Sequence, residues 1–134
     1  MHWSDAQFAL YLARRATELR RHLPDAGADP GAAVLAEAGL LEHLRALARR
    51  HGWLVYHTHD SRRSEPGFPD LVLVKPASAQ AAGRLIFAEV KTAQGKLTVE
   101  QMQWLEVLRH SAAGVEVYCW RPQDLEAICA TLQH

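Results

Sequence analysis

The chain has 134 residues, a length that suits one compact domain able to fold without disulfides or structural metal. Hydrophobic residues make up 49% and charged residues 22%, which excludes an intrinsically disordered or fibrous protein. Fifteen basic residues balance fifteen acidic ones, so any attraction for nucleic acid must be local rather than spread over the whole molecule.

The first 30 residues predict a helical extension. Ser4 and Gln7 fit a capping box, and apolar residues then recur at helical spacing as far as residue 23. A loop rich in proline, glycine and aspartate follows. We therefore expect residues 1–30 to form an N-terminal helix and linker, and residues 31–134 to form the main domain.

A second helix is predicted from Pro30 to about His51. Asp29 can cap it, Pro30 suits a first helical turn, and Gly52 stands where a C-terminal glycine is expected. Gly39 lies inside the helix and marks either a break or a glycine that the helix tolerates. One side of the helix carries the apolar residues Leu40, Leu41, Leu44, Leu47 and Ala48.

Three segments rich in apolar and β-branched residues predict three successive strands, at residues 53–58, 70–75 and 85–91. The later elements are a helix capped by Thr98, a strand at residues 115–120 and a short helix from Pro122 to about Leu132. The order α-β-β-β-α-β, followed by a closing helix, predicts an α/β fold with a mixed sheet flanked by helices.

The cysteine and hydropathy patterns indicate an intracellular protein. Cys119 and Cys129 form no CxxC pair and fit no familiar zinc spacing, so we expect two buried thiols. No stretch of about 18 apolar residues is present to span a membrane, and the N-terminus has no signal-peptide pattern. These features predict a reducing, cytoplasmic environment and no membrane partner.

Charged residues stand at the boundaries of two neighbouring predicted strands. Asp70 opens one strand directly after Pro69, and Glu89 and Lys91 close the next. Residues two apart in a strand project from the same face, so Glu89 and Lys91 emerge together while Val90 points into the opposite layer. We therefore expect two carboxylates and an ammonium group to converge at one end of the sheet.

These three side chains suit a hard divalent cation and phosphodiester hydrolysis. Mg²⁺ takes oxygen ligands and keeps several waters, which Asp70, Glu89 and substrate phosphate oxygens could provide. A bound cation activates water and neutralises charge on the phosphate, and Lys91 would orient the water or stabilise the developing charge. The alternative is a surface Glu–Lys pair on an edge strand, with Asp70 capping a turn.

Two further sets of residues have open roles. Arg62 and Arg63 lie in the polar loop at residues 60–65 that precedes the Pro-Asp motif, where they either contact DNA phosphates or belong to a solvated loop. Trp104, on the helix after Thr98, is expected in the core rather than as a platform for base stacking.

Three motifs follow one another along the chain: Gly67-Phe-Pro-Asp70-Leu-Val-Leu, Glu89-Val-Lys91-Thr and Leu97-Thr-Val-Glu-Gln101-Met-Gln-Trp104-Leu. In this order, over residues 35–120, the sequence resembles the VRR-NUC family, the virus-type replication–repair nuclease branch of the PD-(D/E)xK superfamily. The resemblance implies a restriction-endonuclease-like core and DNA cleavage that depends on Mg²⁺ or Mn²⁺. The N-terminal helix is not required by the minimal family pattern.

The resemblance also implies site residues and partners. A functional glutamine matches Gln101, and we expect the metal ligands to be Asp70, Glu89 and the backbone carbonyl of Val90. Small stand-alone members from phages and bacteria resemble homodimers that act on branched DNA. The resemblance therefore implies a homodimeric, structure-selective endonuclease of branched DNA, such as Holliday junctions. It also implies a role in DNA repair in a bacterium or a phage-infected host.

The family also carries an acidic residue on its first core helix, and two glutamates compete for that role. Glu37 and Glu42 are five residues apart, about 140° around a helix, so at most one faces the site. Glu37 shares the apolar side with Leu40 and Leu44, whereas Glu42 can pair with Arg45 on the solvated side. We therefore predict that Glu37 belongs to the site.

Three other functions remain open, and one of them is a structural or partner-binding helical protein in which the N-terminal helix acts and the motif is incidental. The same scaffold serves restriction-type endonucleases with sequence specificity, and a degenerate nuclease fold can be a non-catalytic DNA-binding or interaction module. Loss of activity usually removes one of the acidic pair or the lysine, and all three are present in this chain. Metal-dependent DNA cleavage is therefore the leading hypothesis.

Overall fold

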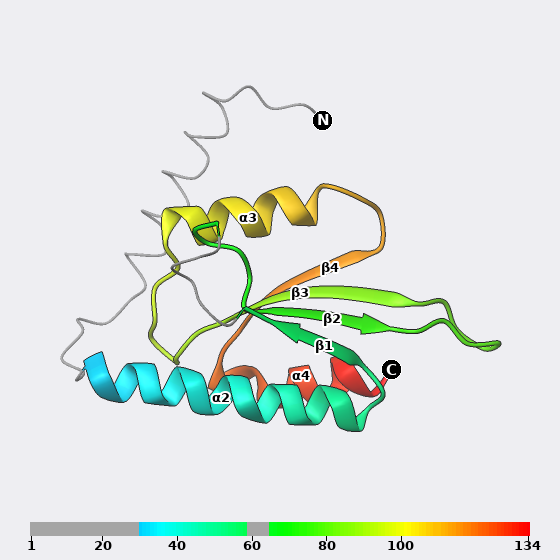
Figure 1. The fold of residues 1–134 in the computed structure, drawn as a ribbon, viewed down its shortest axis with the longest axis horizontal. Helices are drawn as coiled ribbons and strands as arrows, with labels where there is room; N and C mark the ends of the chain where they lie inside the picture. The colour runs from blue at the N-terminus through cyan, green and yellow to red at the C-terminus, as the bar shows by residue number, and fades with distance from the viewer. Residues whose placement is uncertain (1–29, 59–64) are drawn as a thin grey trace.

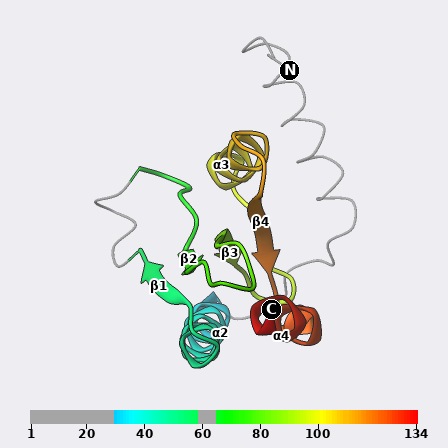
Figure 2. The same cartoon turned by 90° about the vertical axis from the view of Figure 1, so that its right-hand side faces the viewer.

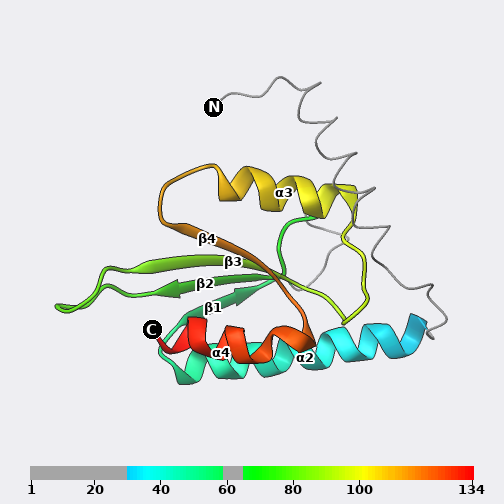
Figure 3. The same ribbon diagram turned by 180° about the vertical axis from the view of Figure 1, so that it is seen from behind.

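The computed structural model describes residues 30–58 and 65–134. In chain order the elements are α2 (Pro30–Arg50), β1 (Leu54–His57), β2 (Leu71–Lys75), β3 (Arg84–Val90), α3 (Val99–Arg109), β4 (Val115–Trp120), a 3₁₀ turn (Pro122–Asp124) and α4 (Leu125–Gln133). Helices α2 and α4 cover one face of the sheet and α3 lies over the other (Figure 1; Figure 3, from behind). This arrangement confirms the predicted α/β fold, while the helix predicted at residues 4–23 lies outside the described residues.

Helix α2 begins at Pro30, as predicted, and runs without interruption through Gly39. A side chain at Gly39 would meet nothing within 4 Å, so the helix tolerates the glycine rather than breaking there. Gly52 follows the helix with a φ of +84°, a left-handed conformation that glycine adopts readily. The predicted apolar side packs into the core through Leu40, Leu44, Leu47 and Ala48, with Leu41 partly buried beside them.

The four strands lie in the order β1-β2-β3-β4. β1, β2 and β3 are antiparallel neighbours, and the register places Leu71 opposite Ala88. β4 runs parallel to β3, with Trp120 opposite Val90. Because parallel neighbours require a crossover connection, α3 lies between β3 and β4 in the chain and packs against both.

Alternation along the strands separates the side chains between the two faces of the sheet. The face toward α2 and α4 carries the main core, which includes Leu71, Leu73, Ile86, Ala88 and Val90. The other face meets α3 through buried Met102 and Leu105. Figure 2 shows α3 above β4, while β1 lies at the opposite side of the sheet.

Polar contacts fasten the C-terminal helix to the end of the sheet that is distant from Asp70. Arg84 donates two hydrogen bonds to Glu116, at 2.7 and 2.8 Å, and a third to the Thr131 carbonyl at 2.8 Å. The Trp53 indole donates to the Leu132 carbonyl at 2.9 Å. The strands and α4 are therefore held together without any of the residues expected in the site.

Two details differ from the sequence predictions. Cys119 and Cys129 are free thiols, but both are half-buried rather than fully buried. The last helix is preceded by the separate 3₁₀ turn, because Asp124 folds back to accept a hydrogen bond from the Arg121 amide at 3.0 Å. Within the part of the chain that the structure describes, no helix has the length and apolarity needed to cross a membrane.

Candidate active site

Asp70 lies at the point where β2 begins and β3 ends. Its carbonyl accepts a hydrogen bond from the Thr58 amide at 3.1 Å, which continues the pairing of β1 with β2. Its carboxylate accepts a hydrogen bond from the Val90 amide at 2.8 Å. The Asp70 side chain thus takes the place of the backbone carbonyl that would otherwise continue the pairing of β2 with β3. The Asp70 carboxylate is thereby placed beside the last residues of β3.

Glu89 is the most deeply buried charged side chain at this end of the sheet, with only 2% of its surface exposed. One carboxylate oxygen, Oε1, accepts a hydrogen bond from the Gln101 amide of α3 at 2.9 Å. The other oxygen, Oε2, is buried and has no hydrogen-bond partner among the described residues. Burial raises the pKa of Glu89 to about 9, and the neighbouring Asp70 carboxylate raises it in the same direction.

Lys91 follows on the same side of the chain as Glu89, as the strand period predicts. Its ammonium nitrogen lies 4.0 Å from Glu89 Oε1, and its side chain is 12% exposed. The Lys91 backbone amide donates to the Trp120 carbonyl at 2.9 Å, so the pairing of β3 with β4 continues past Val90. The ammonium group is therefore held close to the carboxylates while part of it still reaches solvent.

Glu37 and Glu42 of α2 have different surroundings. Burial raises the pKa of Glu37, Lys91 lowers it and Asp70 raises it, so Glu37 lies within electrostatic reach of both site residues. Glu42 is exposed and forms an ion pair with Arg45 at 2.9 Å, three residues along the helix. The predicted Glu42–Arg45 pair is thus confirmed, and the structure brings Glu37 rather than Glu42 toward Asp70 and Lys91.

Gln101 joins the start of α3 to the site. Its amide oxygen accepts from the Thr98 backbone amide at 2.9 Å, and the Thr98 hydroxyl accepts from the Gln101 backbone amide at 3.1 Å. The two residues therefore form a capping box, while the Gln101 amide nitrogen remains directed at Glu89. Only a helix cap by Thr98 was predicted from the sequence, so the capping contact of the Gln101 side chain was missed. The Thr-x-x-Gln pattern at residues 98–101 is the sequence signal that indicates it.

The turn before Asp70 packs tightly against the first turn of α3. Gly67 has a φ of +86°, and a Cβ atom there would lie 2.4 Å from the Glu100 carbonyl carbon. The Phe68 ring meets the Trp104 ring edge-to-face at a centroid distance of 5.1 Å. Trp104 is half-buried over this turn and lies outside the main core, so the prediction that it is a core residue was wrong. Its packing partner, Phe68, comes from a turn distant in sequence, which helical periodicity cannot reveal.

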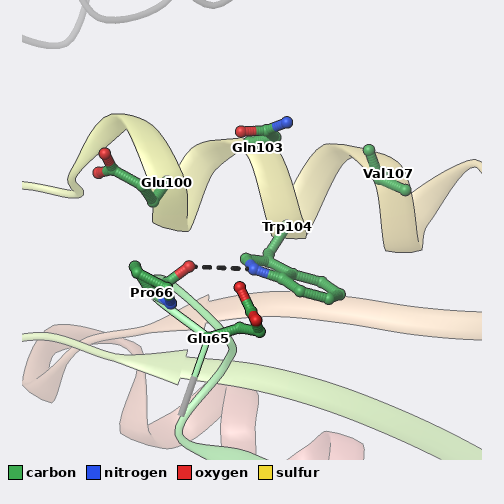
Figure 4. A pocket seen from close by; sticks show the side chains of 6 residues that line it. All are labelled: Glu65, Pro66, Glu100, Gln103, Trp104 and Val107. Atoms are coloured by element: carbon green, nitrogen blue, oxygen red, sulfur yellow. Dashed lines mark hydrogen bonds between the residues drawn. The ribbon is translucent and has the colours of Figure 1, made fainter. Parts of the chain in front are cut away.

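A pocket lies between this turn and α3 (Figure 4). The Trp104 indole donates to the Pro66 carbonyl at 3.1 Å across its floor. The lining residues are Glu65, Pro66, Glu100, Gln103, Trp104 and Val107. Because the two glutamates make its charge negative, this pocket is poorly suited to a phosphate group and is separate from the buried carboxylates of the site.

Arg121 holds the loop between Lys91 and α3. Its guanidinium donates to the Thr92 carbonyl at 2.8 Å and to the Gly95 carbonyl at 2.7 Å. Gln123 donates to the Ala93 carbonyl of the same loop at 3.2 Å. These hydrogen bonds could not be predicted from the sequence, because the residues around Arg121 contain no motif that indicates a contact with a distant loop.

The oxygen-rich arrangement fits a hard divalent cation. The unpartnered Glu89 oxygen is a potential ligand with no competing donor among the described residues, and Asp70 provides a second carboxylate. No three His, Cys, Asp or Glu side chains gather closely enough to hold a metal alone within residues 30–58 and 65–134. Two carboxylates suffice for Mg²⁺ when water and phosphate oxygens complete its coordination.

Three of the predicted contributions are not settled by this geometry. The Val90 amide contacts Asp70, but the proposed role of the Val90 carbonyl as a metal ligand stays a prediction. Arg62 and Arg63 lie outside the described residues. The structure brings Glu37, Asp70, Glu89, Lys91 and Gln101 to one end of the sheet.

Comparison with known protein families adds an independent finding. The model described as the VRR-NUC domain matches residues 12–121, a range that contains all the residues gathered at the site. The match starts inside the segment predicted as an N-terminal extension, and the domain boundary near residue 30 stays a prediction. Neither the curated proteins nor the solved structures give a match.

Replacing Gly67 by alanine should destabilise the protein more than the same change at Gly114. Gly114 has nearly the same φ, +85°, but a Cβ there would meet nothing within 4 Å, so Gly114→Ala costs only the left-handed conformation, about 1–2 kcal/mol. At Gly67 the Cβ also collides with the α3 backbone, so the loss should be larger. Chemical denaturation measures both losses, and equal values would show that the close contact is unimportant.

In the absence of metal, stability should fall as the pH rises from about 4.5 to about 9. The pKa of Glu89 is raised from 4.5 to about 9 on folding. The contribution of Glu89 to the free energy of unfolding is therefore complete below pH 4.5 and is lost as the pH rises to about 9. Thermal melting in EDTA across this window should show a steeper decline for the wild type than for Glu89→Gln. The matched control Glu42→Gln should retain the wild-type slope, and identical slopes for all three proteins would contradict the assignment.

Proposed function

The chain belongs to the VRR-NUC family, a nuclease domain of the PD-(D/E)xK type, and from this premise we propose that it is a metal-dependent, structure-selective DNA endonuclease. The observation that carries the proposal is the burial of Glu89 beside Asp70, with one carboxylate oxygen left without a hydrogen-bond partner among the described residues. An ionised carboxylate buried this deeply is costly in a protein, which is why the pKa of Glu89 is raised to about 9, and a cation at this position would balance the charge of the ionised form.

Asp70 and Glu89 would hold Mg²⁺ or Mn²⁺, with the Val90 carbonyl as a further proposed ligand. The cation, when bound, would lower the pKa of water and neutralise charge on the phosphate. Hydrolysis adds a water oxygen to phosphorus and releases one ester oxygen as an alcohol. Gln101 fixes the orientation of Glu89 through its 2.9 Å hydrogen bond and so acts as a positioning residue.

Lys91 and Glu37 have complementary roles in this proposal. The Lys91 ammonium, 4.0 Å from Glu89, would stabilise negative charge on the phosphate as the new bond forms. Glu37 would accept the proton that the attacking water loses. Burial raises its pKa above that of an exposed glutamate, which makes its carboxylate a better proton acceptor near neutral pH.

The proposal also covers the DNA contacts and the oligomeric state. Arg62 and Arg63 precede the Asp70 turn in the chain and would contact the DNA backbone through charge-assisted hydrogen bonds. Balanced net charge leaves little general attraction for DNA, so a homodimer that presents two sites would enlarge the contact surface and suit branched substrates such as Holliday junctions. Such an enzyme would work in DNA repair in the cytoplasm of a bacterium or a phage-infected host.

Labelled linear, flapped and four-way-junction DNA, each incubated with Mg²⁺, Mn²⁺ or EDTA, tests the proposal directly. We expect cleavage with either cation, none with EDTA, and a preference for the branched forms. Asp70→Asn, Glu89→Gln and Lys91→Ala should each lower cleavage by at least about a hundredfold while leaving thermal unfolding cooperative. Binding without cleavage by the wild type would instead favour a non-catalytic DNA-binding module.

Glu37 and Glu42 provide a matched pair on one helix. Glu37→Gln should lower the cleavage rate by about a hundredfold, since a general base contributes about that much or more. Glu42→Gln makes the same chemical change but breaks only an exposed ion pair, so its rate should stay within about twofold of the wild type. Single-turnover rates on one flapped substrate measure both, and equal rates would remove Glu37 from the mechanism.

A further inference from the structure

Within residues 30–58 and 65–134, part of the sheet face that carries the site is exposed. Leu54 and Tyr56 of β1 are 66% and 63% exposed, and Val74 of β2 is 39% exposed. The register places Leu54 opposite Val74 and Tyr56 opposite Val72, so these four side chains lie on one face. Among the described residues α3 packs against β3 and β4, and the exposed side chains show that no described helix covers the face over β1 and β2.

Strand position places this open face beside the catalytic carboxylate. Asp70 stands two residues before Val72, and the Thr58 amide pairs with the Asp70 carbonyl, so the β1–β2 register extends to the site. Tyr56 and Asp70 are therefore diagonal neighbours on adjacent strands, and residues in such positions lie about 7–8 Å apart. Stacked nucleotides rise about 3.4 Å each, so this distance spans roughly two nucleotides of a strand.

The chemistry of the open face favours a base over a phosphate. Its described members on β1 and β2 are Leu54, Tyr56, Val72 and Val74, which carry no charge. An exposed aromatic ring offers a flat surface for stacking, and its hydroxyl can remain in water. The pocket between α3 and the turn before Asp70 differs, since Glu65 and Glu100 line it and would repel a nucleic-acid strand.

We propose that Tyr56 stacks on an unpaired nucleobase of the strand whose phosphate occupies the site. In a regular duplex each base is covered by its neighbours, so a side chain standing on a sheet can meet a base face only where pairing has been lost. Tyr56 thus selects DNA with a flap, an overhang or an open junction close to the cleavage point. This inference rests on the proposed nuclease function and names the feature of the substrate that the site recognises.

A binding experiment separates this inference from cleavage. The full chain carrying Glu89→Gln is mixed with flapped DNA that has 2-aminopurine at successive positions near the flap base, in the presence of Mg²⁺. Stacking quenches the fluorescence of this base analogue. We expect quenching with Tyr56 or Tyr56→Phe, and at least about tenfold weaker binding with loss of quenching for Tyr56→Ala.

Leu54→Ala is the matched control, because Leu54 lies on the same strand and face with nearly the same exposure but farther from Asp70. It should keep the quenching and the ratio of flap to linear cleavage, whereas Tyr56→Ala in the otherwise wild-type chain should lower that ratio about tenfold. Thermal melting checks that each variant is folded.

Two outcomes would overturn the proposal. Unchanged quenching in Tyr56→Ala would exclude stacking on this ring. Light scattering in which Tyr56→Ala alone converts a dimer to a monomer would assign the face to a second copy of the chain. If the wild type never cleaves but Tyr56→Ala still abolishes quenching, the nuclease function fails while the stacking inference is supported.

Discussion

The burial of the Glu89 carboxylate is the constraint around which this end of the molecule is organised. When Glu89 is ionised, its carboxylate, which is 2% exposed, meets the like charges of Asp70 and Glu37 in a medium that screens them poorly, and this raises its pKa to about 9. Lys91 and Gln101 offset only part of that cost. A cation, or a cation bound to phosphate, would supply the remaining positive charge, which is how the fold is linked to the proposed chemistry.

The main apolar core and the Asp70–Glu89 pair lie on opposite faces of the sheet. The apolar core toward α2 and α4, together with the Arg84–Glu116 pair at the distant end, provides the favourable burial. The face toward α3 carries Glu89 and its polar neighbours, which a fold optimised for stability alone would replace with apolar side chains. Burial in the core on one face offsets the cost of the buried acidic groups on the other.

Periodicity was sufficient to predict the helices, the strands and the side of α2 that carries Glu37, because each depends on residues that are close in sequence. The contacts that complete the site were beyond such reasoning. Arg121 reaches the carbonyls of Thr92 and Gly95, and Gly67 abuts the α3 backbone, through pairings that only the tertiary fold creates. Trp104 was misplaced for the same reason, since a half-buried ring over a distant turn and a core ring have the same helical spacing.

The mixed direction of the strands has a consequence for the order of folding. The antiparallel β1, β2 and β3 pair with their neighbours in sequence, whereas β4 joins β3 only after the chain has crossed over through α3. Local pairings form faster than those that close long loops. Asp70 and Glu89 therefore meet early in the antiparallel meander, while Gln101 and Arg121 arrive with the crossover. We therefore expect a newly made chain to form its acidic pair before the groups that orient it, so that the nuclease site is completed only with the last strand pairing.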